Sequence, residues 1–303
     1  MYPNIIKYYS PITDVTFHRI FGKNIDLAAS LLNAFLPLEE GRKVESLEYI
    51  SPELMPETPA RKNSIVDVCC RDSSGVQFLV EMQINWPEDF YQRVLFNASK
   101  AYVNQLGKGR TYKMLQPVYS LNFVNGNSHP GLTEWYHPYR IVHQYHSDLV
   151  IEGLHIVFAE MDKYRKLNVK GNSKRDLWMR YFTELTENTR KPAEDLLADP
   201  EVGKAIELLE AINYSEEERY LYDRYWDAVS IEATLRDAGI QEGMERGMAK
   251  GIERGIVIGV EQGVQQGIQQ ERHQLVLKML NKGLPPSLVA EVTGLTEEEV
   301  INY

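Results

Sequence analysis

The stretch that decides the fold is residues 64–83, which read SIVDVCCRDSSGVQFLVEMQ. Residues 64–71 and 76–83 are rich in β-branched and other apolar side chains, a composition that favours strands buried on both faces. The four residues between them, Asp72-Ser73-Ser74-Gly75, have the composition of a turn. The sequence therefore predicts a β-hairpin in the interior of a sheet.

Two carboxylates flank this hairpin symmetrically, because Asp67 and Glu81 each lie seven residues from Ser74. An odd-numbered loop, or an even one with a bulge, places them opposite each other, whereas a slip of one residue separates them across the sheet. Gln83 shares the face of Glu81, since residues two apart on a strand point the same way. The simplest alternative is that each acid sits at a strand end in solvent.

Two like charges on a hydrophobic sheet are unfavourable unless a cation lies between them. Ligands that are all oxygen atoms favour Mg²⁺ or Mn²⁺ over zinc. The pair Asp67 and Glu81, with Gln83 beside it, is therefore a candidate site for such an ion.

The segments around the hairpin predict helices and further strands. Helical spacing of apolar residues covers residues 14–21 and 27–36, and a longer helical pattern covers 88–106. Strands are expected at residues 44–50, 117–124 and 154–160. This order predicts an α/β fold, a mixed sheet flanked by helices.

Composition narrows the class of protein. The 303 residues are 43% hydrophobic and 25% charged, as in globular proteins, and contain no apolar run long enough to span a bilayer. The first residues lack the pattern of a signal peptide, and the only two cysteines are the adjacent Cys69 and Cys70. A cytoplasmic protein without a disulfide framework or a membrane partner is therefore expected.

The net charge of −10 is unevenly distributed along the chain. Residues 1–183 carry 21 basic and 19 acidic side chains, whereas residues 184–242 carry 6 basic and 16 acidic ones. The first segment can therefore approach a polyanion, although the whole chain is acidic.

The second half of the chain predicts an all-helical region. Glycines recur every fourth residue from Gly239 to Gly267, each followed by an apolar residue. In a helix these eight glycines cost about 6–8 kcal/mol relative to alanine, which a closely packed second helix would offset. We expect homo-oligomerisation through this segment; the alternative is a long exposed helix without a partner. A helical hairpin is expected at its end, with Thr296 and Glu299 forming a capping box.

These patterns predict four parts. They are a mixed α/β domain at 1–171, an acidic helical region at 172–238, a glycine-repeat helix at 239–271 and a helical hairpin at 272–303.

Residues 10–165 resemble the PD-(D/E)XK nuclease superfamily, which has a restriction-endonuclease-like fold, and within it the Rpn family of recombination-promoting nucleases, also described as transposases. The resemblance makes the part at 1–171 a nuclease-like domain. It is carried by residues 13–22, the strand pair 65–68 and 80–83, Arg93, Tyr102, residues 105–107, Tyr112, residues 117–121 and the late segment 156–164, with the four-residue glycine repeat as a further likeness. It implies a Mg²⁺- or Mn²⁺-dependent endodeoxyribonuclease acting on double-stranded DNA in recombination or mobile-element turnover. The other possibility is a weakly active or inactive oligomeric DNA-binding scaffold with the same fold.

The resemblance also implies roles for single residues. Asp67 and Glu81 occupy the metal-binding acidic positions of the motif, and the backbone carbonyl of Met82 is a further ligand. Gln83 stands where most of the superfamily has Lys, so it can orient water but supplies no charge. Asp14 is either an additional metal ligand or a helix cap.

Basic residues after the hairpin are candidates for contacts with DNA phosphates. The predicted contacts are Arg93, Lys100, Lys108, Arg110 and Lys113. A second candidate cluster is Lys163, Arg165, Lys166, Lys170, Lys174 and Arg175. The histidines at 137, 143 and 146 lack the spacing of a metal site and are expected to be ordinary strand and loop residues.

Overall fold

The computed structural model describes residues 7–39, 41–54, 64–84, 89–107, 109, 111–167 and 171–303, without the side chains of 53, 54, 64 and 65. Contacts divide the chain into two compact units, Met1–Asp227 and Ala228–Tyr303. The four-part division expected from the sequence stays a prediction.

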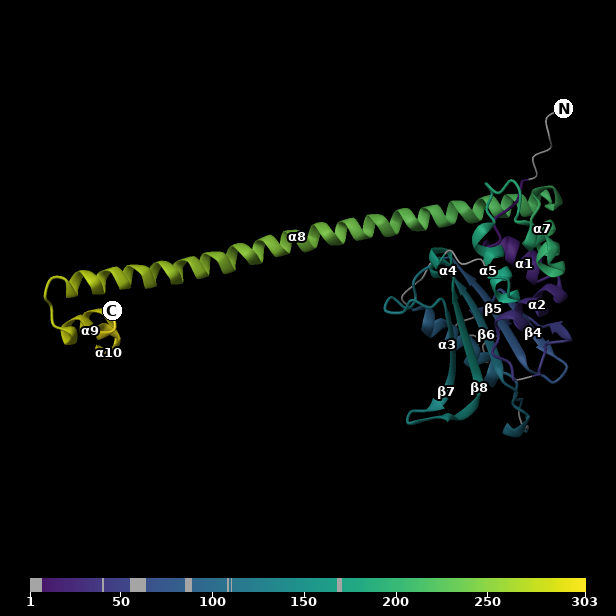
Figure 1. The fold of residues 1–303 in the computed structure, drawn as a ribbon, viewed down its shortest axis with the longest axis horizontal. Coiled ribbons are helices and arrows are strands. Elements are labelled where there is room, and N and C mark those ends of the chain that lie inside the picture. Colours follow the sequence, from purple (N-terminus) through teal and green to yellow (C-terminus); the bar gives the residue numbers. More distant parts are fainter. Residues whose placement is uncertain are drawn as a thin grey trace, which may run out of the picture. The chain divides into compact units, whose positions relative to one another are not determined.

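A six-stranded mixed sheet forms the centre of the first unit, with strand order β1-β4-β5-β6-β8-β7 (Figure 1). β1, β4 and β5 are antiparallel neighbours, β5, β6 and β8 run parallel, and β7 returns antiparallel to β8. A separate two-stranded sheet pairs β2 with β3. The strands are β1 Leu47–Tyr49, β2 Glu53–Leu54, β3 Ser64–Ile65, β4 Val68–Asp72, β5 Gln77–Gln83, β6 Val118–Val124, β7 Tyr136–His143 and β8 His146–Glu160.

Helices cover both faces of this sheet. On one face, α1 (Asp14–Phe21), α2 (Ile25–Phe35) and α5 (Lys174–Glu184) bury aromatic and aliphatic side chains against the strands. On the other face, α3 (Phe90–Val103) packs Ala98 and Ala101 against the strands. Figure 1 shows α3 apart from α1 and α2 across the strands. The predicted α/β fold, a mixed sheet flanked by helices, is thereby confirmed.

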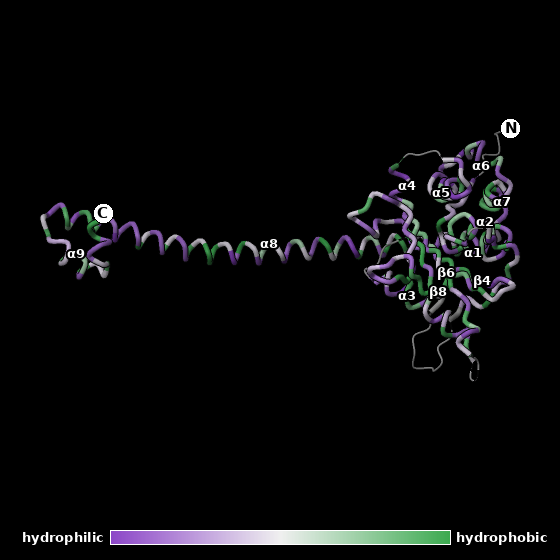
Figure 2. The backbone as a smooth tube through the Cα atoms, turned by 60° about the horizontal axis from the view of Figure 1, so that its bottom comes forward, coloured by the Kyte–Doolittle hydropathy of each residue, from purple (hydrophilic) through white to green (hydrophobic). Residues whose placement is uncertain are grey.

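Short helices complete this unit, and they include the helices expected in the acidic region. They are α4 Met161–Leu167, α6 Glu194–Ala198, α7 Pro200–Leu208 and the 3₁₀ helices η1 Tyr112–Met114 and η2 Ala211–Asn213. Figure 2 shows the hydrophobic residues concentrated on the strands and on the helices against them.

The turn of the β4–β5 hairpin follows its composition. Gly75 has a φ of 91°, a left-handed conformation that glycine adopts without strain. The Asp72 carboxylate accepts backbone N–H groups from Ser74 and Val76 at 2.9 and 3.0 Å. Arg71 pairs with Gln77, so the loop between them has five residues and is centred on Ser74. This odd-numbered loop is the case in which Asp67 comes opposite Glu81.

The strand expected from residue 64 onwards is interrupted at Asp67, which forms a bend between β3 and β4. β7 was not expected, and β8 begins eight residues before the predicted start at 154. Its first half and β7 form a ribbon of mainly exposed residues with register shifts after Arg140 and Val142. Because this ribbon is not buried on either face, it lacks the apolar alternation that marks a strand in a sequence.

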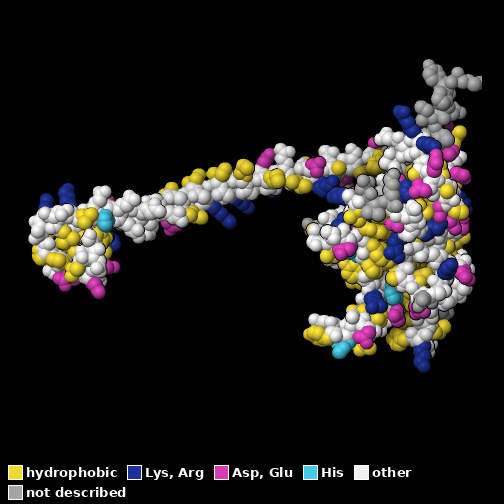
Figure 3. Space-filling model, viewed as in Figure 1, with side chains coloured by type: hydrophobic (Ala, Val, Ile, Leu, Met, Phe, Trp, Pro, Cys, Tyr) yellow, Lys and Arg dark blue, Asp and Glu magenta, His cyan; other side chains and the backbone are white. Residues whose placement is uncertain are grey.

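The second unit contains most of α8 (Glu216–Leu280), followed by α9 (Pro286–Thr293) and α10 (Glu297–Ile301). Val276, Val289 and Val300 form its small core, and the predicted capping box of Thr296 and Glu299 is present. The apolar residues that follow the repeat glycines are between 52% and 71% exposed. Figure 3 shows such side chains along the surface of α8. No helix among the described residues is both long and apolar enough to cross a membrane.

Candidate active site

The candidate site lies where the parallel strands end. Val68 pairs with Val80, so the next register position places Asp67 opposite Glu81. Across the sheet, Gln83 pairs with Val124 and Val124 with Glu160, which aligns the ends of β5, β6 and β8 along one edge. In sheets of this kind ligands bind at the carboxyl ends of the strands.

Asp67 is held against the backbone of the neighbouring strand. Its Oδ2 atom accepts the N–H of Met82 at 2.6 Å. Burial raises the pKa of Asp67 to about 7; the hydrogen bond from Met82 opposes this, and the charges of Asp14 and Glu81 add to it. The carboxylate is therefore within electrostatic reach of two others, which a cation would stabilise.

Glu81 is 6% exposed and points to the face covered by α3. Asn97 of α3 donates its Nδ2–H to Glu81 Oε1 at 2.7 Å, and Arg93 Nη2 lies 3.6 Å from Glu81 Oε2. Burial raises the pKa of Glu81, while the hydrogen bond from Asn97 and the charge of Arg93 lower it in part. One oxygen is thus fixed by an amide, and the other faces a cation.

Arg93 also contacts Gln83, whose Oε1 accepts a hydrogen bond from Nη2. The guanidinium lies over the ring of Phe90 at 4.7 Å and is 40% exposed. The structure therefore places Arg93 beside the candidate catalytic residues Glu81 and Gln83, an arrangement that the sequence pattern alone did not indicate.

Asp14 is not the cap of α1. That position is taken by Thr13, whose hydroxyl accepts the N–H of Thr16. Asp14 is exposed in the first turn, and its charge raises the pKa of Asp67. The helix-cap alternative is wrong, and the role of Asp14 as a metal ligand stays a prediction.

The other predicted DNA contacts are spread out. Lys100 lies on α3 about two turns beyond Arg93, with Nζ over the Phe96 ring at 5.6 Å. Lys113 is exposed in η1, which precedes the start of β6 rather than the strand ends. Lys108 and Arg110 lie outside the described residues.

The second basic cluster is largely engaged within the protein. Lys163 is paired with Glu160 at 2.7 Å and its side chain is only 10% exposed. Lys174 binds Asp199 and Glu201, Arg165 pairs with Asp162, and the Arg175 guanidinium stacks on the Tyr136 ring. Lys170 lies outside the described residues. A phosphate-binding role for Lys163 is therefore wrong, since its charge is already neutralised by Glu160.

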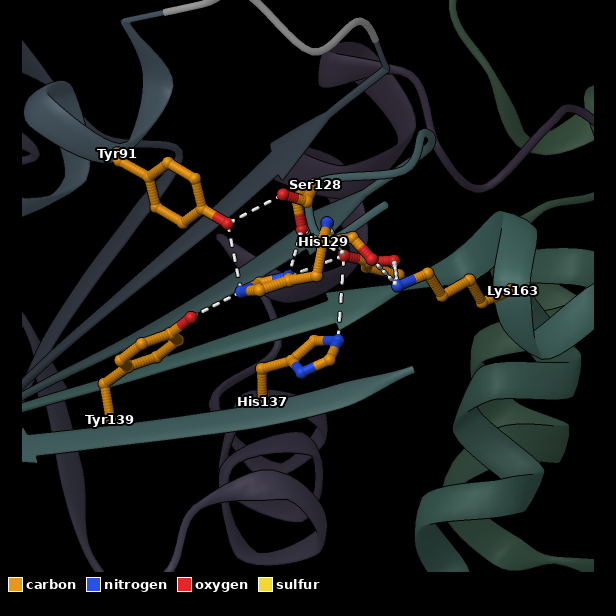
Figure 4. Close-up of polar contacts among 7 residues, drawn as sticks. Tyr91, Ser128, His129, His137, Tyr139 and Lys163 are labelled. Atoms are coloured by element: carbon orange, nitrogen blue, oxygen red, sulfur yellow. Dashed lines mark hydrogen bonds and ion pairs between the residues drawn. The ribbon is translucent and has the colours of Figure 1, made fainter. Parts of the chain in front are cut away.

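A buried polar network occupies the same edge at the end of β8 (Figure 4). Glu160 is fully buried, and its Oε1 accepts hydrogen bonds from the Ser128 hydroxyl, from the His129 N–H at 2.9 Å and from His129 Nδ1 at 2.7 Å. His129 Nε2 faces the hydroxyls of Tyr91 and Tyr139. No sequence pattern indicated this network, because Ser128 and His129 lie in a loop without a motif.

Although His129, His137 and Glu160 are close enough to hold a metal ion, their geometry favours an internal network. The two imidazole rings stack at 3.8 Å with 24° between their planes. A metal ion lies about 2.0–2.1 Å from a ligating nitrogen and in the plane of its ring, which two stacked rings cannot both achieve. In addition, Lys163 already supplies a positive charge to Glu160.

The protonation states of Glu160, His129 and His137 follow from their hydrogen bonds and burial. Burial favours the neutral form of Glu160, but hydrogen bonds from Lys163, Ser128 and His129 outweigh it and lower its pKa. Burial and the neighbouring His129 lower the pKa of His137, which favours the neutral ring. Because Glu160 is ionised, His129 Nδ1 is the donor of their hydrogen bond.

The groups that fit a divalent cation are therefore those at the hairpin. Asp14, Asp67 and Glu81 offer carboxylate oxygens and Met82 a backbone carbonyl, which are the hard ligands that Mg²⁺ and Mn²⁺ prefer. Burial disfavours the ionised forms of Asp67 and Glu81 and raises the pKa of both, and the charge of Arg93 offsets this only in part. A bound dication would favour the ionised forms.

Comparison with models of protein families matches residues 11–232, nearly three quarters of the chain, to the family described as PD-(D/E)XK nuclease family transposase. The matched range contains the whole sheet and the candidate site. None of the curated proteins and none of the solved structures compared with the chain matches it significantly.

Proposed function

Because this chain belongs to the PD-(D/E)XK nuclease family transposases, we propose that it is a metal-dependent endonuclease that hydrolyses phosphodiester bonds in double-stranded DNA. Membership of the family carries the nuclease- or transposase-associated role. The metal, the substrate and the residues that act are the proposal, which includes a cytoplasmic setting and a part in recombination or mobile-element turnover.

One observation carries it. Asp67 comes opposite Glu81 at the end of the hairpin, and burial, together with the charges of Asp14 and Glu81, raises the pKa of Asp67 to about 7. A cation favours the ionised forms of two neighbouring carboxylates that are largely removed from solvent. A Mg²⁺ or Mn²⁺ ion supplies a Lewis acid at this place when it is bound.

Asp67 and Glu81 would hold the ion, with the Met82 carbonyl and Asp14 as further ligands. Asn97 fixes one oxygen of Glu81, which orients the carboxylate before the substrate arrives. The Gln83 amide positions a water molecule for in-line attack on phosphorus. The water oxygen bonds to phosphorus as the bond to the leaving sugar oxygen breaks; the proton of the water passes to solvent, and the leaving oxygen takes one from solvent.

The test is nicking of supercoiled plasmid in the presence of Mg²⁺ or Mn²⁺. Asp67→Ala and Glu81→Gln should reduce the rate by at least about 100-fold, as expected for loss of a metal-held transition state. Glu48→Gln, which removes an exposed carboxylate on β1 paired with Arg71, is the matched control and should nick at the wild-type rate. Equal nicking by wild type and Asp67→Ala would refute the proposal.

The second candidate function is a catalytically weak DNA-binding scaffold. The neutral Gln83 in place of the motif Lys favours it. It predicts metal-independent DNA binding with no Asp67-dependent nicking, so the same assay separates the two.

We further propose that the chain forms homo-oligomers through the glycine-repeat segment of α8. Apart from the adjacent backbone of the helix itself, a Cβ atom added at any of the eight glycines would meet no described atom within 4 Å. Beside them lies a line of exposed apolar side chains. A second copy of the same helix can approach closely along the glycines and bury that line.

A further inference from the structure

Gln83 leaves the candidate site without the positive charge that a lysine would bring, yet a guanidinium lies beside it. Arg93 Nη2 donates a hydrogen bond to Gln83 Oε1 and lies 3.6 Å from Glu81 Oε2. Arg93 belongs to α3, ten residues further along the chain than Gln83. A positive charge therefore reaches the place of the missing lysine from a different element.

The position of the Arg93 side chain is fixed by three contacts. Its guanidinium lies over the ring of Phe90, which is fully buried, and both polar contacts are made by Nη2. Nε and Nη1 make no hydrogen bond to any residue that the structure describes, and 40% of the side chain is exposed. The guanidinium fork is thus anchored at one nitrogen and open to a ligand at the others.

A guanidinium is suited to phosphate because its parallel N–H groups match two phosphate oxygens. It stays protonated throughout a reaction, so it stabilises negative charge without exchanging a proton. At the edge where Asp67 and Glu81 would hold the metal, the negative charge that develops is that of the pentacovalent phosphate.

We propose that Arg93 is a catalytic residue that contacts the scissile phosphate and supplies the charge that Gln83 lacks; this rests on the nuclease function proposed above. Water attack and departure of the sugar oxygen proceed as already described, and Arg93 neither gains nor loses a proton.

The alternative is that Arg93 merely holds Gln83 and Glu81 in place. A variant that lacks the positive charge of Arg93 and carries one at position 83 distinguishes the two roles. Lysine at position 83 restores the charge of the site but does not restore the contacts that Arg93 makes. The variants are Arg93→Gln, Arg93→Lys, Gln83→Lys and the double variant Arg93→Gln with Gln83→Lys. Lys191→Gln, which removes an exposed cation paired with Glu194, is the control.

Plasmid nicking should fall about 100- to 1,000-fold in Arg93→Gln, the loss typical of one transition-state donor. Arg93→Lys should recover part of this loss, and the double variant should nick at least about tenfold faster than Arg93→Gln. Lys191→Gln should match wild type. Rescue by charge at position 83 is the result that a structural role does not produce.

Mn²⁺ binding measured by titration calorimetry gives a readout apart from cleavage. Arg93→Gln should bind Mn²⁺ at least as tightly as wild type well above neutral pH, because a competing cation beside Glu81 is removed.

Each outcome decides the question. Three results would overturn the role of Arg93 without touching the proposed function. They are an unchanged cleavage rate in Arg93→Gln, a double variant that nicks no faster than Arg93→Gln, and a loss of Mn²⁺ binding in Arg93→Gln that parallels the loss of cleavage. Absence of metal-dependent nicking by the wild-type protein overturns the proposed function and this inference together.

Discussion

Asp67→Asn should stabilise the metal-free protein while abolishing its stabilisation by metal. The pKa of Asp67 is raised to about 7 from an ordinary value of 3.8 because of its burial and the charges of Asp14 and Glu81. A carboxyl group with a raised folded-state pKa favours folding while protonated. Its contribution is therefore complete below the unfolded pKa and is lost as the pH rises through about 7.

The size of the effect follows from the pKa difference. At about 1.36 kcal/mol per unit, the ionised side chain costs the folded protein about 4 kcal/mol at about pH 8. Solvent at this partly exposed carboxyl screens the cost, so about 2 kcal/mol is the smaller expectation. Asparagine keeps an oxygen that can accept the Met82 N–H. The midpoint of thermal unfolding should rise by about 4–10 °C.

The assay is thermal unfolding followed by circular dichroism over a range of pH. The gain should shrink as the pH falls and vanish toward about pH 3, below the unfolded pKa of 3.8, where both the folded and the unfolded wild type hold the proton. Millimolar Mg²⁺ should raise the midpoint for wild type and leave Asp67→Asn unchanged. Asp148→Asn, which neutralises an exposed carboxyl on β8, is the control; it should neither raise the midpoint nor abolish the response to Mg²⁺. An Asp67→Asn variant as stable as wild type, or less stable, at about pH 8 would refute the carboxylate cluster.

Two further results are expected. Lys163→Met should lower the free energy of unfolding in urea by about 3–5 kcal/mol at neutral pH, and by less in acid, where Glu160 can protonate. Lys166→Met, which removes an exposed cation, is the control, and an equal loss in both variants would contradict the buried pair of Lys163 and Glu160. Replacing Ile252, Ile256 and Val260 with Gln should convert an oligomer into a monomer in analytical ultracentrifugation, with the helical circular dichroism signal unchanged. A wild-type protein that is monomeric at micromolar concentration would rule out oligomerisation through the glycine-repeat segment.

The hairpin was predictable because its chemistry is local. The turn Asp72–Gly75 and the apolar runs beside it followed from composition, whereas the register of Asp67 and Glu81 stayed open in the sequence because it depends on whether Val76 belongs to the loop. The position of Gln83 on the face of Glu81 followed from strand periodicity. The turn and this periodicity need no knowledge of the rest of the fold.

The features that the sequence did not predict depend on contacts between residues far apart in the chain. Arg93 was expected to bind phosphate, but its contact with Gln83 depends on how α3 docks on the sheet. Similarly, Glu160 meets His129 from 31 residues away, across a connection that no short pattern marks. The β7–β8 ribbon escaped prediction because strands exposed on both faces carry no burial signal.

The four-residue spacing in α8 has a consequence for how this helix can change in length. Gain or loss of one complete tetrad shifts the later glycines by about 6 Å along the axis and turns them by about 40°, which continues the existing spiral. A single inserted residue instead rotates everything beyond it by about 100° and breaks the spiral. Insertion or deletion of complete four-residue units therefore preserves the line of glycines along α8, whereas any other insertion interrupts it.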